Sequence, residues 1–166
     1  MAELTPSERL QPCLLDRLTD DDPSNEREAR DERVINMRRY RQAVFRDLSW
    51  LLNTSAHVAA DGLEDFEEVP SSVLNFGVRD ITGMTTSGFE ADELQSQILD
   101  AIRRFEPRIQ AGSFSVKVRA DPSAMHQRAV SFEIKGDLWA QPTPESLYIR
   151  TEIDLETGNY QLKQGS

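Results

Sequence analysis

Two stretches of the chain have the apolar spacing of amphipathic helices. From about residue 37 to residue 52 the apolar positions are Met37, Tyr40, Val44, Leu48, Leu51 and Leu52. From about 91 to 105 they are Leu94, Ile98, Ala101, Ile102 and Phe105. A recurrence of about 3.6 residues predicts helices that each pack one face on a core. The second helix is expected to end before Pro107, because the residue preceding a proline is disfavoured in the helical region.

After residue 113 the period changes to strict alternation of apolar and polar side chains. Three segments show it, with apolar positions at Phe114, Val116, Val118; Val130, Phe132, Ile134, Leu138; and Leu147, Ile149, Ile153, Leu155. Alternation predicts strands with one buried and one wet face, and consecutive strands of this kind form an antiparallel meander. Because the helices precede the strands, the predicted fold class is α+β, with N-terminal helices packed on a C-terminal three-stranded antiparallel sheet.

The N-terminal part differs from this predicted domain. Residues 1–33 are interpreted as a partly mobile arm with a short helix, since Leu10, Leu14 and Leu18 are spaced four apart and a turn-rich acidic stretch follows. Residues 34–166 are interpreted as a single domain. Within it, residues 70–76 predict a short helix, and Gly77 stands at the position of a left-handed C-terminal cap.

Composition narrows the classes of protein. The chain has 166 residues, a formal net charge of −10 and one cysteine, Cys13. The acidic balance argues against general nucleic-acid binding, which uses Lys and Arg to neutralise phosphates. No apolar run approaches the roughly 20 residues of a membrane span, the N-terminus lacks the pattern of a signal peptide, and a single cysteine fits a reducing compartment. We therefore expect a cytoplasmic protein without direct membrane insertion.

Charge is unevenly distributed along the chain. Residues 61–68 carry five acids and no base, whereas residues 38–46 carry four arginines and no acid. Either run is a solvated face or a surface that docks a partner of opposite charge, and the pattern alone leaves both open.

The sequence offers little for catalysis. Glu64, Asp65, Glu67 and Glu68 crowd into one loop, whereas a catalytic pair of carboxylates needs two environments that separate their pKa values. The two histidines are isolated, Cys13 sits beside leucines like a small core residue, and there is neither a phosphate-binding glycine loop nor a nucleophile elbow. We predict no enzymatic activity, no metal and no cofactor.

Two features suggest contacts with other proteins. A three-stranded sheet has two edges, and an exposed edge can accept a strand from a partner, unless the arm or a loop covers it. The tripeptide Glu106-Pro107-Arg108 follows the second helix, and its proline fixes the direction of two opposite charges. A local helix-capping role for this tripeptide is the alternative.

Five blocks of the chain, in order, resemble the family of the type VI secretion baseplate subunit TssE. They span residues 8–23, 44–54, 72–83, 102–109 and 150–158, and the fourth contains the family's Glu-Pro-Arg motif. The resemblance implies a structural subunit of a contractile injection machine, related to phage baseplate wedge proteins, in a baseplate docked at the inner-membrane complex.

The resemblance also implies partners and contact residues. Glu106, Pro107 and Arg108 would anchor the subunit in the wedge beside TssF and TssG and near TssK. The strands at 130–138 and 147–155 would face the TssB–TssC sheath, which docks by strand exchange. The corresponding residues are Val130, Phe132, Ile134, Tyr148, Arg150, Glu152 and Asp154. Two alternatives are a cytoplasmic regulator that binds an adaptor protein through the same fold and a glycoside hydrolase acting on cell wall, which an older lysozyme-related label of the family suggests.

Overall fold

The computed structural model describes residues 10, 12–19, 23–24, 35–57, 66–82, 91–119, 129–140 and 143–165. Most of the predicted arm over 1–33 lies outside these residues, as do Glu64 and Asp65. The helices are α1 (Leu14–Leu18), α2 (Met37–Leu52) and α3 (Ala91–Phe105), with two 3₁₀ turns, η3 (Val69–Ser71) and η4 (Val73–Asn75). The strands are β1 (Ser115–Arg119), β2 (Ala129–Leu138), β3 (Glu145–Asp154) and β4 (Tyr160–Gln164).

Both amphipathic helices form where the apolar spacing predicts them. At the start of α2 the Asn36 side chain accepts a hydrogen bond from the Arg39 N–H at 2.9 Å, which satisfies one of the unpaired donors of the first turn. Helix α3 carries two acids in its first turn and two arginines in its last, the charge order that a helix dipole favours. The helix stops at Phe105, two residues before Pro107.

The sheet has four strands, one more than the sequence predicts. All neighbours are antiparallel in the order β1-β2-β3-β4. The missed strand, β4, offers only Tyr160 and Leu162 as apolar positions, which is too short a run for alternation to be recognised. It returns along β3 through a turn in which Gly158 adopts a φ of 71°, a conformation that favours glycine.

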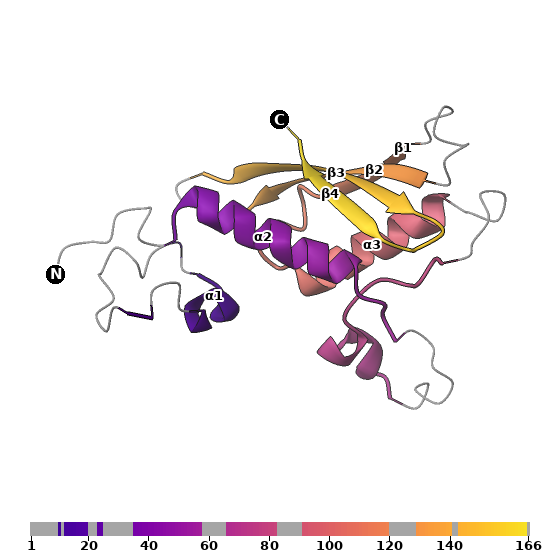
Figure 1. Ribbon diagram of the computed structural model, residues 1–166, viewed down its shortest axis with the longest axis horizontal. Helices are drawn as coiled ribbons and strands as arrows, with labels where there is room; N and C mark the ends of the chain where they lie inside the picture. The colour runs from indigo at the N-terminus through magenta and orange to yellow at the C-terminus, as the bar shows by residue number, and fades with distance from the viewer. Residues whose placement is uncertain are drawn as a thin grey trace.

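The two long helices cover one face of the sheet, as Figure 1 shows. Helix α3 lies against β1 and α2 lies against β4. The core between them contains Val44, Leu48, Ile98, Ile102, Phe132, Ile134, Ile149 and Ile153, among others. On the other side of the helices from the sheet lie α1 and the 3₁₀ turns (Figure 1). No helix of the described residues is long and apolar enough to cross a membrane.

The segment after α2 returns to pack beside its end. Val78 donates its N–H to the Thr54 carbonyl at 2.9 Å, and Ala56 donates to the Val78 carbonyl at 2.8 Å. Gly77 has a φ of 129°, and a Cβ at this position would lie 2.2 Å from the Thr54 carbonyl oxygen. The predicted positive φ at Gly77 is confirmed, whereas the single short helix predicted before it consists of two 3₁₀ turns.

Candidate functional site

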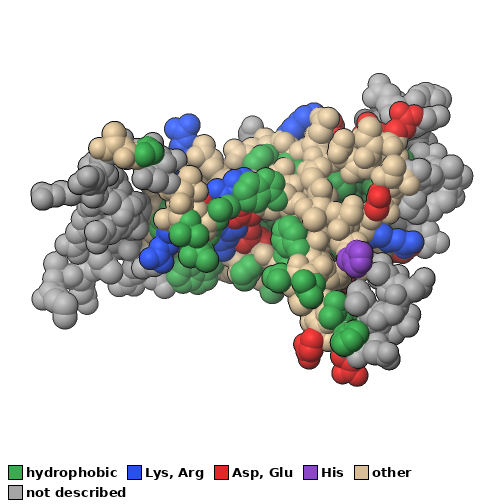
Figure 2. All heavy atoms as spheres, turned by 60° about the horizontal axis from the view of Figure 1, so that its bottom comes forward, with side chains coloured by type: hydrophobic (Ala, Val, Ile, Leu, Met, Phe, Trp, Pro, Cys, Tyr) green, Lys and Arg blue, Asp and Glu red, His purple; other side chains and the backbone are tan. Residues whose placement is uncertain are grey.

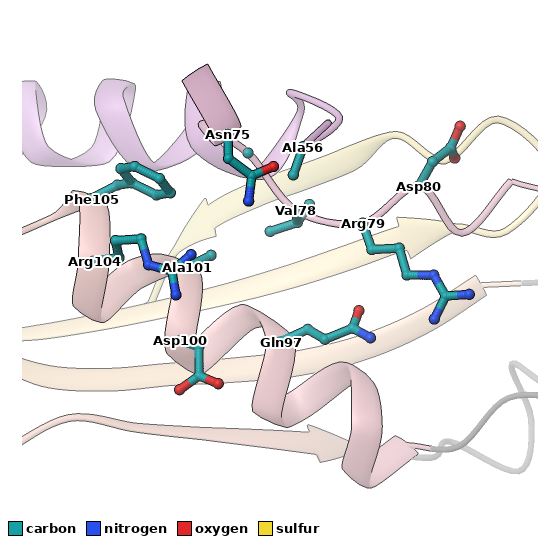
Figure 3. A pocket seen from close by; sticks show the side chains of 11 residues that line it. Ala56, Asn75, Val78, Arg79, Asp80, Gln97, Asp100, Ala101, Arg104 and Phe105 are labelled. Carbon is teal, nitrogen blue, oxygen red and sulfur yellow. The ribbon is translucent and has the colours of Figure 1, made fainter. Parts of the chain in front are cut away.

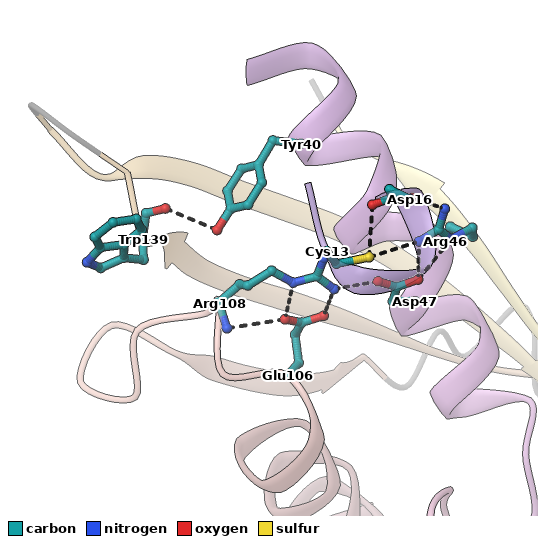
Figure 4. Close-up of polar contacts among 8 residues, drawn as sticks. All are labelled: Cys13, Asp16, Tyr40, Arg46, Asp47, Glu106, Arg108 and Trp139. Atoms are coloured by element: carbon teal, nitrogen blue, oxygen red, sulfur yellow. Dashed lines mark hydrogen bonds and ion pairs between the residues drawn. The ribbon is translucent and has the colours of Figure 1, made fainter. Parts of the chain in front are cut away.

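Glu106-Pro107-Arg108 folds into a compact ion pair at the end of α3. The Glu106 side chain is buried, with 3% of the residue exposed. Arg108 donates to one carboxylate oxygen from Nε at 2.6 Å and to the other from Nη2 at 2.5 Å, and its backbone N–H reaches Oε1 at 3.2 Å (Figure 4). The bidentate geometry is the one in which Arg binds a carboxylate most strongly.

Arg108 also links this turn to α2. Its Nη2 donates to Oδ2 of Asp47 at 2.6 Å, so one guanidinium bridges two carboxylates from different elements. Burial disfavours the charged form of Arg108, but the hydrogen bonds and charges of Glu106 and Asp47 outweigh burial and hold its pKa above the ordinary value. Arg108 is therefore a permanent cation that ties α2 to the end of α3.

The line of alternating charges continues from Asp47 to α1. Arg46 donates from Nε to Oδ1 of Asp47 at 2.8 Å and from Nη1 to Oδ1 of Asp16 at 2.5 Å. The Cys13 thiol donates to Oδ2 of Asp16 at 2.9 Å (Figure 4). Burial raises the pKa of Asp16, but the bonds from Arg46 and Cys13 lower it by more, so the net shift is downward. These contacts attach α1 to α2.

A groove of about 260 Å³ lies over this ion-pair chain. Asp47, Glu106 and Arg108 line it together with the apolar residues Leu15, Leu51, Trp50, Phe76 and Phe105. Helix α1 supplies Leu15 to this lining, and Phe76 of the lining directly follows η4. We define the docking face as the groove together with the exposed apolar residues Leu14 and Leu18 of α1, Trp50 of α2, and Val73 and Leu74 of η4.

Large apolar side chains of the docking face stand in solvent. The exposed fractions are 71% for Leu14, 74% for Leu18, 51% for Trp50, 80% for Val73 and 73% for Leu74. Figure 2 shows hydrophobic side chains gathered on this side of the molecule. Exposed apolar side chains around a groove lined with charged residues are typical of a surface that binds another protein.

The residues predicted to face the sheath do not share one surface. Phe132 and Ile134 are 1% and 0% exposed and pack in the core under the helices, with Val130 partly buried beside them. Tyr148, Arg150, Glu152 and Asp154 alternate with the core residues of β3 and lie on the opposite face of the sheet. Moreover, β2 and β3 are the two central strands, so among the described strands the sheet edges belong to β1 and β4.

The outward face of the sheet carries a polar network centred on Tyr148. Its hydroxyl donates to Oε1 of Glu133 at 2.8 Å, while Lys135 Nζ and Arg150 Cζ lie 4.9 Å and 5.7 Å from the centre of its ring. Glu133 is only 7% exposed although it lies on the side of the sheet away from the helices. Strand alternation places Glu133 on this face, but its partners depend on the strand register.

The structure also adds Asp47, Arg46 and Asp16 to the site, and sequence reasoning missed all three. Asp47 and Arg108 are 61 positions apart. No local pattern connects residues so far apart, and the four arginines of residues 38–46 suggested only a solvated or partner-binding run.

The comparisons with known proteins decide the family. A family model described as "Baseplate wedge protein gp25" matches residues 38–143, which is more than half of the chain. The chain belongs to the baseplate wedge protein gp25 family. The type VI secretion subunit TssE is in the same family, so the resemblance seen in the sequence is confirmed.

Membership of the gp25 family makes the chain a component of a phage-tail-like baseplate that interacts with other baseplate components. The matched range includes α2 from its second residue, Glu106-Pro107-Arg108, β1 and β2, and ends before β3. Neither a curated protein nor a solved structure matches the chain.

Proposed function

We propose that the chain is a structural, non-enzymatic subunit of a type VI secretion baseplate. The observation that carries this proposal is the gp25 family match over residues 38–143. The five ordered blocks that resemble TssE support the type VI assignment within that family.

The docking face would hold the subunit in the wedge beside TssF and TssG and near TssK. The Nε and Nη2 donors of Arg108 are already bound to Glu106 and Asp47. The Glu-Pro-Arg turn therefore stabilises the lining of the groove, and the partner contacts chiefly the exposed apolar side chains of Leu14, Leu18 and Trp50. Burial of these side chains would supply the binding energy, at about 25 cal/mol for each Å² of apolar surface removed from water.

The sheet would template the TssB–TssC sheath at one of its edges. Strands β1 and β4 each pair on one side only among the described strands, and each is five residues long, whereas β2 and β3 have ten. Strand β4 pairs with residues 149–153 of β3, so residues 145–147 extend beyond its paired stretch. A sheath strand added there would continue the sheet, and a preformed edge would lower the ordering cost of the first sheath ring.

Two features argue against hydrolysis. The Glu106 carboxylate is buried and held by Arg108, which leaves it without access to a substrate. Glu67 and Glu68 are exposed on the surface. A purified chain that cleaved peptidoglycan, and lost that activity on Glu106→Gln or Glu68→Gln, would overturn the non-enzymatic proposal.

Sheath assembly in the native host tests the structural role. We expect fluorescently labelled TssB to form extended sheaths in the host, none after deletion of this chain, and sheaths again when the wild-type chain is restored. Normal sheaths in the deletion strain would contradict the proposal and favour an adaptor-binding regulator on the same fold.

A further inference from the structure

The molecule has two further surfaces besides the docking face. The first is a cavity of about 590 Å³ between residues 75–80 and α3, and Figure 3 shows Asp80, Asp100, Arg79 and Arg104 around it. Because both signs of charge line this cavity, its chemistry favours no single class of ligand. The second surface is the outer edge of β4, the last strand of the described sheet, where backbone and charge together are selective.

Asn53 occupies one end of the β4 edge. Its Oδ1 accepts from the Tyr160 N–H at 2.9 Å, and its Nδ2 donates to the Tyr160 carbonyl at 3.0 Å. These are the two hydrogen bonds that a residue of a neighbouring antiparallel strand would exchange with Tyr160. The Asn53 amide therefore takes the place of the first residue of a fifth strand, and Tyr160 is closed to an incoming chain.

Beyond Tyr160 the edge is open at two residues. The N–H and C=O of one strand residue point to the same side, and the side alternates along the strand, so Leu162 and Gln164 point away from β3 as Tyr160 does. Gly165 fits this alternation, because its N–H points back and donates to the Tyr148 carbonyl at 3.0 Å. Among the described residues neither Leu162 nor Gln164 has a backbone partner on the outer side. The edge thus offers two donors and two acceptors in a fixed register.

Lys163, between these two residues, gives the edge its charge. Its side chain is 60% exposed and lies on the outward face of the sheet, since Leu162 packs against the core and neighbouring side chains alternate. It stands directly opposite Arg150 of β3, and the acid that contacts it, Glu152 at 3.0 Å, is also on the β3 side. On the open side, an acidic residue opposite Lys163 would gain an attractive cross-strand pair, whereas a basic residue would face a like charge.

The same lysine disfavours pairing with a second copy of the chain. An antiparallel pair that used both open residues would place Leu162 of each copy opposite Gln164 of the other. The two Lys163 side chains would then lie directly opposite each other, which is destabilising. A lysine on an edge strand is a common device against such self-association. The edge therefore fits a different strand, one that carries an acid.

We propose that the outer edge of β4 accepts an extended, antiparallel strand of a partner protein and that Lys163 selects an acidic residue at its centre. The residues on either side of the acid pair their backbones with Leu162 and Gln164. Their side chains lie on the face that carries Leu162, which favours apolar residues. Asn53 sets the register by closing Tyr160. The inference rests on the proposed sheath contact for the identity of the partner and adds the chemistry of its strand.

Nuclear magnetic resonance with a capped peptide tests the proposal. Acetyl-Thr-Val-Glu-Val-Thr-amide is titrated into the ¹⁵N-labelled full chain at low ionic strength. We expect saturable shifts of the backbone amides of Leu162 and Gln164, and none at Val116 and Val118 of the other edge strand, β1. No shift at the two β4 positions up to the solubility limit of the peptide would overturn the proposal.

The charges of the peptide and of residue 163 test the selection. The peptide with Lys in place of Glu is expected to bind about fivefold more weakly, the effect of one cross-strand charge pair. Lys163→Gln should remove this preference. Lys117→Gln is the matched control, because Lys117 is also an exposed lysine of a five-residue edge strand but lies in β1. An unchanged preference in Lys163→Gln, or a preference lost in Lys117→Gln, would overturn the role of Lys163.

N-methylated peptides test the backbone contact with the chain unchanged. In the proposed register the N–H groups of both valines point to β4, and that of the glutamate points away. Methylation of both valine nitrogens should weaken binding about tenfold or more, and methylation of the glutamate nitrogen should change it little. Equal loss for the two peptides would contradict the register. Because the peptides contain no sheath sequence, failure here leaves the structural role standing, and that role fails separately if sheaths form in the deletion strain.

Discussion

Replacing Arg108 by methionine tests whether the ion-pair chain holds the helices together. Arg108→Met keeps most of the apolar stem but removes the guanidinium, and with it the side-chain hydrogen bonds of residue 108 to Glu106 and Asp47. The Glu106 carboxylate, 3% exposed, is then left without its cation in a place that water hardly reaches.

The magnitude follows from burial. Removing one partner of a buried ion pair costs about 3–5 kcal/mol. The side chains of Arg108 and Asp47 keep 21% and 24% of their surface exposed, which places the expected loss near the lower end. A loss of about 3 kcal/mol is a large share of the roughly 5–15 kcal/mol that stabilises a domain, and it corresponds to a melting temperature about 10 °C lower.

Urea unfolding, followed by circular dichroism, measures this loss of free energy. Arg79→Met is the matched control, because Arg79 pairs with Glu93 at 3.2 Å while both side chains are more than half exposed. Such an exposed pair contributes less than about 1 kcal/mol. If Arg108→Met and Arg79→Met unfold at the same urea concentration, the ion-pair chain does not hold this junction and the reasoning fails.

A second substitution separates lost attraction from an orphaned charge. Adding Glu106→Gln to Arg108→Met removes the unpaired carboxylate, so the double variant is expected to be more stable than Arg108→Met alone by about 1–2 kcal/mol. A double variant that is less stable than Arg108→Met would mean that the charge of Glu106 is not the source of the loss.

Three further predictions concern other parts of the molecule. Leu14→Ser with Leu18→Ser removes two solvent-exposed side chains, so the free energy of unfolding should change by less than about 0.5 kcal/mol for each, while the recovery of wedge partners falls sharply. A folded variant that recovers the partners in full would exclude these leucines from the docking face. Gly77→Ala should lower the melting temperature by several degrees, because residue 77 has a φ of 129° and an added Cβ would clash with the Thr54 carbonyl. Gly112→Ala is the control, because an added Cβ there has open space, and its melting temperature should change little. Equal melting temperatures of the two variants would refute the close approach at Gly77. The pKa of Asp16 is lowered in the folded chain, so its contribution to stability is present above its ordinary pKa of about 3.9 and is lost as the pH falls through the lower folded value. Asp16→Asn should therefore destabilise the chain by up to about 1 kcal/mol at pH 7 and by less at pH 2.5. A difference in unfolding free energy that does not change with pH would contradict this.

The fold could be predicted where the signal is local and long. Helices α2 and α3 have repeated apolar spacing over 16 and 15 residues, and their predicted limits agree with the structure. Strand β4 could not be found in this way, because five residues give too little alternation. Its absence from the prediction also made β3 look like a sheet edge, although it is a central strand.

The candidate site was only partly predictable for the same reason. Glu106 and Arg108 are two positions apart, so their pairing can be anticipated from sequence. The bond from Arg108 to Asp47 depends on how α2 packs against α3, and nothing in the local sequence states this. Alternation correctly places Phe132 and Arg150 on opposite faces, but choosing sheath-facing residues by strand alone put both faces into one predicted surface.

The central claim is that this chain is a wedge subunit held by its docking face, and affinity purification tests it most directly. The tagged chain and the Leu14→Ser, Leu18→Ser variant are purified from the native host while it expresses the machine, and bound proteins are quantified by mass spectrometry. We predict that the wild-type chain recovers TssF, TssG and TssK, with TssB and TssC at lower yield, and that the variant loses them. Recovery of an unrelated adaptor, or of no baseplate protein at all, would contradict the type VI assignment and leave the chain as a gp25-family protein of another machine.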